Sequence, residues 1–254
     1  MKEFAGKVAG ITGAANGIGD PTEASVAERS DGTLLATLRP DGSLERQVIA
    51  SIAQGLKAKP ENAGDWRALC DLFAKPSLQM VSFTITEKGY ALRDLQGQWL
   101  PLVRQDLASG PACPRHVMSV VASLLLRRFE AGARPVALVS MDNCSRNGEK
   151  LRRSVLEIAH GWQENGFVPQ AYVSWLEDES RVSFPWTMID KITPRPDASV
   201  EDMLRMAGVE DLEPVITGKN TYVAPFVNAE ECQYLVIEDN FPNGRPALEE
   251  GGVI

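Results

Sequence analysis

The amino-acid sequence predicts an α/β fold built on a mainly parallel sheet. Two observations carry this prediction. Short apolar runs rich in β-branched residues alternate with segments of helical apolar spacing, and a glycine-rich turn follows the first of these runs. Strands separated by helices are joined by crossover connections, which favour parallel pairing. With 44% hydrophobic and 24% charged residues, the chain has the composition of a soluble globular protein with a sizeable core.

The first expected strand, residues 7–12, leads into a turn with the pattern T-G-x-x-x-G-x-G, whose glycines are Gly13, Gly17 and Gly19. Glycines let the backbone approach a pyrophosphate closely, and the free N–H groups of a following helix attract an anion. We therefore expect these glycines to bind a dinucleotide. An ordinary glycine-rich turn is the alternative, and Asp20-Pro21 interrupts the helix that should come next.

Two αβ units are expected in the middle of the chain. In the first, residues 65–73 have helical apolar spacing and precede a β-branched run at 78–86. In the second, residues 116–129 carry one apolar stripe, Gly132 is typical of a helix C-cap, and residues 136–140 form a short buried strand.

The remaining segments give a hairpin, two helices and two extended stretches. Residues 33–38 and 46–52 flank a turn at Asp41-Gly42 and predict the hairpin. One helix is expected from about residue 151 to a stop near Gly166, after a polar loop at 142–148, and another from a capping box at residues 199–202. The extended stretches are residues 214–217 and 234–238.

Charge and cysteine usage exclude several classes of partner. The formal net charge of −8 leaves no basic cluster for nucleic acid or an anionic membrane. No run approaches the roughly 18 apolar residues of a membrane span, and the N-terminus lacks a signal-peptide pattern, so we expect a cytoplasmic protein with a small-molecule partner. No zinc ligand set is formed by the two histidines and the cysteines, Cys70, Cys113, Cys144 and Cys232. The oligomeric state is left open.

Four blocks of sequence resemble the mannitol dehydrogenase family, the polyol-specific long-chain dehydrogenases, which also contain fructuronate reductases. They are residues 81–90 (VSFTITEKGY), 140–148 (SMDNCSRNG), 182–194 (VSFPWTMIDKITP) and 236–246 (VIEDNFPNGRP). The resemblance runs from about residue 32 to the end. It implies a single dinucleotide-binding domain over residues 1–254, with a Rossmann-like sheet that is incomplete and lacks the family's helical C-terminal domain.

Residues 1–19 resemble instead the start of a short-chain dehydrogenase. That family transfers a proton through a tyrosine and a lysine four residues apart. The tyrosines of this chain are followed at that spacing by Asp94, Leu176, Phe226 and Glu238. The short-chain active site is therefore not expected here.

The longer resemblance implies an oxidoreductase that transfers a hydride between NAD, or NADP, and the C2 secondary alcohol of a polyol or sugar acid. Mannitol with fructose and mannonate with fructuronate are the candidate pairs. The family's catalytic lysine, followed closely by asparagine and histidine, would lie beyond Ile254, so we expect this chain to be a poor enzyme, because general-base catalysis is worth about 10² to 10⁴ in rate. A non-catalytic nucleotide-binding remnant or interaction module is the alternative.

The resemblance assigns catalytic roles to Asn143, in the D-N motif, and to Asp190. A neutral amide beyond a buried strand can hydrogen-bond a forming alkoxide without titrating, and parallel sheets bind ligands at this strand end. The alternative for Asn143 is a turn residue bonded to its own backbone. For Asp190 the alternative is an exposed pair with Lys191 at a strand end.

Further cofactor contacts are expected at Thr86, Glu87 and Asp142, just past the strands that precede them. Glu87 falls in the family's T-E-x-G-Y motif; a surface carboxylate is its alternative. His116 and His160 lie within expected helices and match no catalytic histidine, so we expect solvated or core side chains for both.

Overall fold

The computed structural model describes residues 8–12, 33–38, 43–49, 54–190, 197–210, 212–213, 215–216, 222–223, 226–230 and 234–251. The expected phosphate-binding glycines, Gly13, Gly17 and Gly19, lie outside these ranges. The chain divides into two compact units. The first comprises Met1–Gly19, Leu56–Met188 and Val236–Ile254, and the second comprises Asp20–Gly55 and Ile189–Leu235.

A four-stranded parallel sheet forms the centre of the first unit. Its strands follow the order β1 (Val8–Thr12), β4 (Met80–Thr84), β5 (Val136–Ser140) and β6 (Val182–Ser183). Thr12 pairs with Thr84, and Phe83 pairs with Ser140, so the carboxyl ends of three strands share one edge. This sheet confirms the predicted α/β class, and β5 has the predicted bounds.

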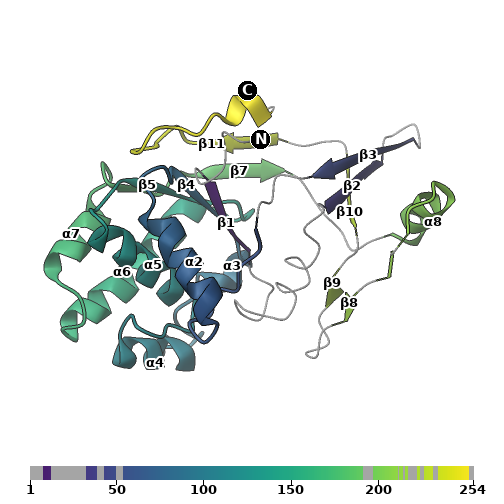
Figure 1. Ribbon diagram of the computed structural model, residues 1–254. Helices are drawn as coiled ribbons and strands as arrows, with labels where there is room; N and C mark the ends of the chain where they lie inside the picture. The colour runs from purple at the N-terminus through teal and green to yellow at the C-terminus, as the bar shows by residue number, and fades with distance from the viewer. Residues whose placement is uncertain are drawn as a thin grey trace. The chain divides into compact units, whose positions relative to one another are not determined.

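Helices cover one face of this sheet (Figure 1). They include α2 (Ala63–Ala74), α5 (Val117–Glu130), α6 (Asn147–Glu164) and α7 (Gln170–Glu177). Alternate strand residues such as Val81, Phe83 and Leu138 pack into this helical layer. Burial against helices accounts for the apolar residues at alternate positions of these strands.

The C-terminal segment packs against the other face. Ile237 and Phe241 contact the small cluster of Met80, Ala137 and Val139. Beyond them, Asn243 Nδ2 donates to the carbonyls of Pro76 and Leu78 at 2.9 and 2.7 Å, which fixes the turn before the short 3₁₀ helix η1 (Leu248–Gly251). The two faces of β4 and β5 are thus buried by segments from distant parts of the sequence.

The second unit contains the predicted hairpin, although its second strand occupies Leu44–Ile49 and not the predicted residues 46–52. Strand β2 (Thr33–Leu38) pairs antiparallel with β3 (Leu44–Ile49), and β10 (Val227–Glu230) adds to β2 in parallel. Strands β8 (Val215–Ile216) and β9 (Tyr222–Val223) form a further antiparallel pair. A small core holds the unit together: Ala36, Val200, Leu204, Leu212 and Phe226. Strand β7 (Thr187–Asp190) pairs with β11 (Tyr234–Ile237).

Several local predictions need correction. Helix α8 (Ala198–Met206) is capped by Asp197, whose carboxylate accepts from the Ser199 backbone at 2.8 Å, so the expected capping box at Ser199 is wrong. The strand expected over 78–86 stops at Thr84 because α3 (Thr86–Gly89) begins there. The helix expected from about residue 151 begins at Asn147, within the expected polar loop. Periodicity did not predict the short helices α4 (Pro101–Ser109) and α7.

Among the helices that the structure describes, none has both the length and the apolar composition needed to cross a membrane.

Arg128 on α5 fastens the amino ends of β4 and β5. Its side chain is 1% exposed, and the guanidinium donates hydrogen bonds of 2.7 to 2.9 Å to five backbone carbonyls. These carbonyls belong to Phe73, Lys75, Leu78, Arg134 and Pro135. Burial lowers the pKa of the guanidinium to about 10. The two helix-to-strand connections are therefore joined through one buried cation.

Replacing Arg128 by methionine should lower the free energy of unfolding by about 3 kcal/mol or more, because two buried and three part-buried hydrogen bonds to backbone carbonyls lose their charged donor. The matched control is Arg127→Met on the same helix. Arg127 forms a half-exposed pair with Glu130, and its loss should cost below about 1 kcal/mol. Urea denaturation measures both. Equal losses in the two variants would contradict the structural role of Arg128.

His116 is the N-cap of α5, a correction to its expected place within the helix. Its Nδ1 accepts from the Met118 backbone at 3.3 Å, and its own backbone N–H donates to buried Asp106 at 2.8 Å. Burial lowers the pKa of the imidazole, against the opposing effect of Asp106. The folded protein therefore favours neutral His116, whose free lone pair caps the helix.

The unfolded chain binds a proton at His116 more readily than the folded chain does, since the folded pKa is the lower one. Stability should therefore be complete above the ordinary pKa of 6.5 and be lost as the pH falls below it. His116→Asn keeps a good N-cap and removes the titrating group. Urea denaturation across this pH range should show a flatter profile for the variant; an unchanged profile would refute the assignment.

Candidate active site

The loops that follow β4 and β5 meet at the carboxyl edge of the parallel sheet. Residues 85–90 follow β4, and residues 141–146 lead from β5 into α6. Strand β1 ends at the same edge, with Thr12 beside Thr84. Open α/β sheets bind ligands outside this edge, where helices begin and backbone N–H groups point outward. The edge is therefore the candidate site.

The carboxylate of Asp142 joins the two loops. Its Oδ2 accepts from the Ile85 backbone at 3.0 Å and from the Tyr90 hydroxyl, and its Oδ1 accepts from the Thr86 backbone at 2.9 Å. Both oxygens of this side chain are thus engaged within the chain. Bonds to an ionised acceptor are stronger than those between neutral groups, so this contact sets the spacing of the loops.

Thr86 has a left-handed backbone, with φ of 61°. This conformation is unfavourable for a β-branched residue and costs about 1 to 3 kcal/mol. The hydrogen bond from its N–H to Asp142 holds it there. Its side chain is exposed, as are those of its neighbours Thr84 and Glu87. Polar side chains therefore line the edge next to a strained turn.

Tyr90 is buried behind this turn. Its hydroxyl contacts Ser140 Oγ at 2.7 Å as well as Asp142, and its carbonyl accepts from Ser154 Oγ on α6 at 2.7 Å. Burial, followed by the bond to Asp142, raises the pKa of the phenol well above its ordinary value of 10. Tyr90 therefore remains a neutral donor.

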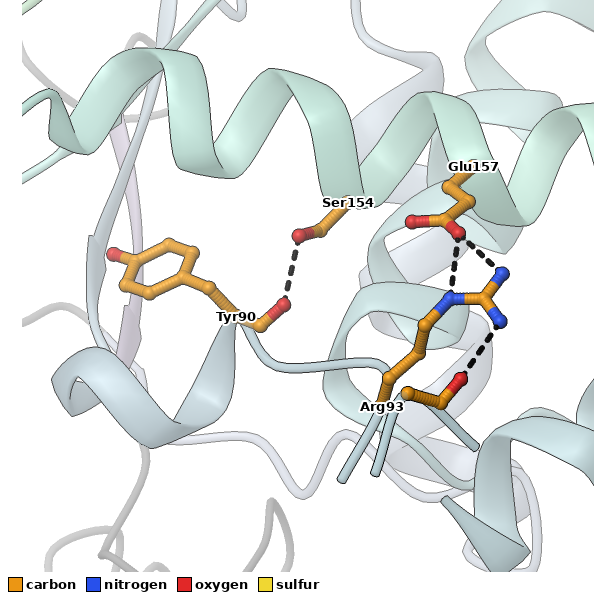
Figure 2. Close-up of polar contacts among 5 residues, drawn as sticks. Tyr90, Arg93, Ser154 and Glu157 are labelled. Atoms are coloured by element: carbon orange, nitrogen blue, oxygen red, sulfur yellow. Dashed lines mark hydrogen bonds and ion pairs between the residues drawn. The ribbon is translucent and has the colours of Figure 1, made fainter. Parts of the chain in front are cut away.

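The segment after Tyr90 is fastened to α6. Figure 2 shows the Tyr90 carbonyl meeting Ser154 and the Arg93 guanidinium meeting Glu157. The Arg93–Glu157 ion pair measures 2.7 Å, and the same guanidinium lies 3.5 Å from the centre of the Trp99 ring. These contacts tie the loop after β4 to the helix after β5.

Asn147 fixes the second loop from inside. Its Nδ2 donates to the Asp142 carbonyl at 3.1 Å and to Thr187 Oγ1 at 2.7 Å, while its Oδ1 accepts from the backbones of Gly148 and Thr187. Arg146, just before it, has a left-handed φ of 57°. A buried amide with all its groups paired holds this loop in one conformation.

Asn143 lies exposed between these anchors. Its amide makes no hydrogen bond to any residue that the structure describes, so it does not cap its own turn there. Both the donor and the acceptor of the side chain are available to a ligand.

Glu87 and Lys150 form an ion pair at the rim, with Oε1 and Nζ 2.5 Å apart. The hydrogen bond that Lys150 donates to Glu87 raises the pKa of the lysine. Nearby, burial raises the pKa of the Cys144 thiol, against the opposing charge of Lys150. Cys144 therefore remains a neutral thiol. The ion pair with Lys150 holds the Glu87 side chain beside the carboxyl edge of the sheet.

The structure brings four of the predicted site residues to one edge: Thr86, Glu87, Asp142 and Asn143. Asp190 is exposed at the end of β7 and belongs to the second unit. Lys191, its alternative partner, lies outside the described ranges, as do the three glycines. Within the described parts, no group of three His, Cys, Asp or Glu side chains could hold a metal ion.

Sequence reasoning did not single out Tyr90 and Asn147. Both stand within the quoted blocks, at the end of VSFTITEKGY and near the end of SMDNCSRNG. Their position beside the expected site residues was the available signal.

A family model described as the mannitol dehydrogenase Rossmann domain matches residues 43–250. The chain belongs to the mannitol dehydrogenase family.

Individual relatives support this family assignment. The chain is 48% identical over 217 residues to a D-mannonate oxidoreductase from Thermotoga maritima, a match that covers 85% of this chain and 40% of the relative. Mannitol 2-dehydrogenase of Pseudomonas fluorescens, solved as a ternary complex with NAD and D-mannitol, is 31% identical with a TM-score of 0.70, over 92% of this chain and 44% of that one.

Another solved relative is a substrate-free D-sorbitol dehydrogenase. It is 27% identical with a TM-score of 0.73, over 92% of this chain and 45% of that one. The chain thus spans less than half the length of these mannitol dehydrogenase relatives. The fold of the matched part confirms the Rossmann-like prediction.

In this mannitol dehydrogenase domain, Gly148 allows α6 to start against the segment after β6. A Cβ there would lie 2.4 Å from the Phe184 carbonyl oxygen and 2.9 Å from a Trp186 ring carbon. Backbone atoms cannot move away as a side-chain end can. The site helix therefore requires glycine at this position.

Gly148→Ala should lower the free energy of unfolding by about 1 to 3 kcal/mol, as overpacking does. Gly161→Ala on the same helix is the control. Its Cβ would meet only the end of the Leu107 side chain, and alanine gains up to about 1 kcal/mol in helix propensity. Thermal or urea unfolding compares the two. Equal stability of the variants would show that the contact at Gly148 yields easily.

Proposed function

We propose that this chain binds a nicotinamide dinucleotide and uses Asn143 in hydride transfer at the C2 secondary alcohol of a polyol or sugar acid. The observation that carries the proposal is the free Asn143 amide at the carboxyl edge of the parallel sheet. The family and the ternary complex of a relative with NAD and D-mannitol support it. Of the two candidate pairs, mannonate with fructuronate is favoured by the 48% identity to a D-mannonate oxidoreductase.

The residues at this edge fit a dinucleotide. Exposed polar side chains of Thr86, Glu87 and Asn143 follow two parallel strands, and a third strand leads there toward the glycine-rich sequence. We assign Gly13, Gly17 and Gly19 to the pyrophosphate, and both NAD and NADP remain candidates. When bound, the nicotinamide ring supplies the hydride donor or acceptor.

Asn143 would donate an N–H to the substrate oxygen as negative charge develops on it. Donors placed in this way contribute about 2.7 to 4 kcal/mol to lowering a barrier. Asp190 would orient a substrate hydroxyl. Oxidation also needs a group that takes the hydroxyl proton, and we assign that role to none of the described residues. Turnover by this chain should accordingly be weak.

The family match runs through both compact units, which supports treating them as one dinucleotide-binding domain. A small-molecule substrate and a cytoplasmic location complete the proposal.

The test begins with binding. NADH and NADPH are titrated into the chain while nicotinamide fluorescence is followed, and oxidation of mannonate and mannitol is then assayed. Asn143→Ala should leave the Kd for the nucleotide within about twofold and lower turnover by about 10²-fold or more, because only the charged transition state loses its donor.

Asn165→Ala is the matched control, since Asn165 is an exposed asparagine at the far end of α6. It should retain full turnover. Turnover that survives Asn143→Ala would refute the role of that residue. Binding without turnover would favour the nucleotide-binding remnant.

A further inference from the structure

The position of Asn143 is set by its neighbours. Its side chain has no hydrogen-bond partner among the described residues, yet the backbone on either side is fixed. Met141 N–H donates to the Phe83 carbonyl at 2.7 Å, which extends the β4–β5 ladder past the end of the strand. Cys144 N–H donates to the Asp142 carbonyl at 2.8 Å. The direction of the Asn143 side chain therefore depends on how firmly residue 142 is held.

Residue 142 is held mainly through its side chain. Three donors converge on the Asp142 carboxylate, and two of them are backbone N–H groups of a strained turn. The third is the Tyr90 hydroxyl, whose contact lies 52 residues away in sequence. It is the side-chain donor among the three, and its ring lies in the buried core.

The Tyr90 hydroxyl has more partners than burial alone requires. A buried phenol usually needs one hydrogen-bond partner, and Ser140 Oγ at 2.7 Å would suffice. The additional bond to Asp142 couples the phenol to the loop. The other end of the residue is fixed as well, since its carbonyl accepts from Ser154 (Figure 2). Tyr90 can therefore transmit the rigidity of α6 to the site.

We propose that Tyr90 and Asp142 are positioning residues for the Asn143 amide. Through the hydroxyl-to-carboxylate bond they fix residue 142 against the turn at Thr86, so that the Asn143 amide faces the substrate in one direction. This inference rests on the proposed function, in which the Asn143 amide meets the reacting oxygen. Without the hydroxyl, the Asp142 carboxylate keeps two backbone donors but loses its side-chain donor.

Tyr90→Phe, made in the full chain, tests this role, because it removes the hydroxyl and leaves the ring. Tyr172→Phe is the matched control: Tyr172 is also buried, and its hydroxyl donates to the Ala122 carbonyl at 2.7 Å in the helical layer. Tyr90→Phe loses the contacts to Ser140 and Asp142, and Tyr172→Phe loses one buried hydrogen bond, so both variants should lose thermal stability. A difference between the two variants in the loops at the candidate site then measures how far Tyr90 positions the Asn143 amide.

The first readout is amide hydrogen exchange followed by NMR. Tyr90→Phe should accelerate exchange at Ile85 and Thr86 by about tenfold or more and shift the backbone resonance of Asn143, because the Asp142 contact loosens. Tyr172→Phe should change none of these. Equal acceleration in both variants, or none in Tyr90→Phe, would overturn the proposal.

The second readout is kinetic. Tyr90→Phe should lower kcat by about tenfold and leave the KM for the nucleotide nearly unchanged; in the Asn143→Ala background it should have no further effect on kcat, since both changes act through one amide. Additive losses would overturn the proposal. A wild-type chain that binds neither NADH nor NADPH would refute the proposed function, whereas the exchange measurements would still decide whether Tyr90 and Asp142 order the loop.

Discussion

The carboxylate of Asp142 is the contact on which the candidate site depends. It accepts from two backbone N–H groups and one hydroxyl, all contributed by the loop after the neighbouring strand. An ionised acceptor with three donors in a half-buried place is stronger than the neutral bonds around it. Because the Asp142 carboxylate joins them, the loops after β4 and β5 are held together as one structural unit at the edge of the sheet. Thr86 keeps an unfavourable backbone conformation for the same reason.

A few side-chain hydrogen bonds also fix the opposite end of the sheet. The Arg128 guanidinium joins the helix-to-strand connections at the amino ends of β4 and β5, and Asn243 adds the C-terminal segment to the Leu78 carbonyl. Both strands are therefore held at one end by the buried Arg128 cation and at the other by the half-buried Asp142 carboxylate. A rigid sheet between these ends lets the exposed side chains at the carboxyl edge keep defined positions.

Some elements followed directly from the residues. The strand at 136–140 was predicted to the residue, since an unbroken apolar run bounded by a helix and a polar loop has few other solutions. The hairpin of β2 and β3 followed from its turn. Predictions failed where a single side chain, local or distant in sequence, competes with periodicity. Asp197 took the cap expected at Ser199, and the strand through Thr86 ended early because Asp142 stabilises a turn there.

The sequence by itself determined the α/β class, the family and the candidate site residues, because strand and helix periodicity and the quoted motifs are local properties of the chain. Only the tertiary structure decided which groups support those residues. Tyr90 and Asp142 are 52 positions apart, and Asn147 and Thr187 are 40 apart. The first pair meets through the register of the parallel strands β4 and β5, and the second meets where β7 passes the start of α6. Contacts between residues so far apart follow no periodic pattern in the sequence.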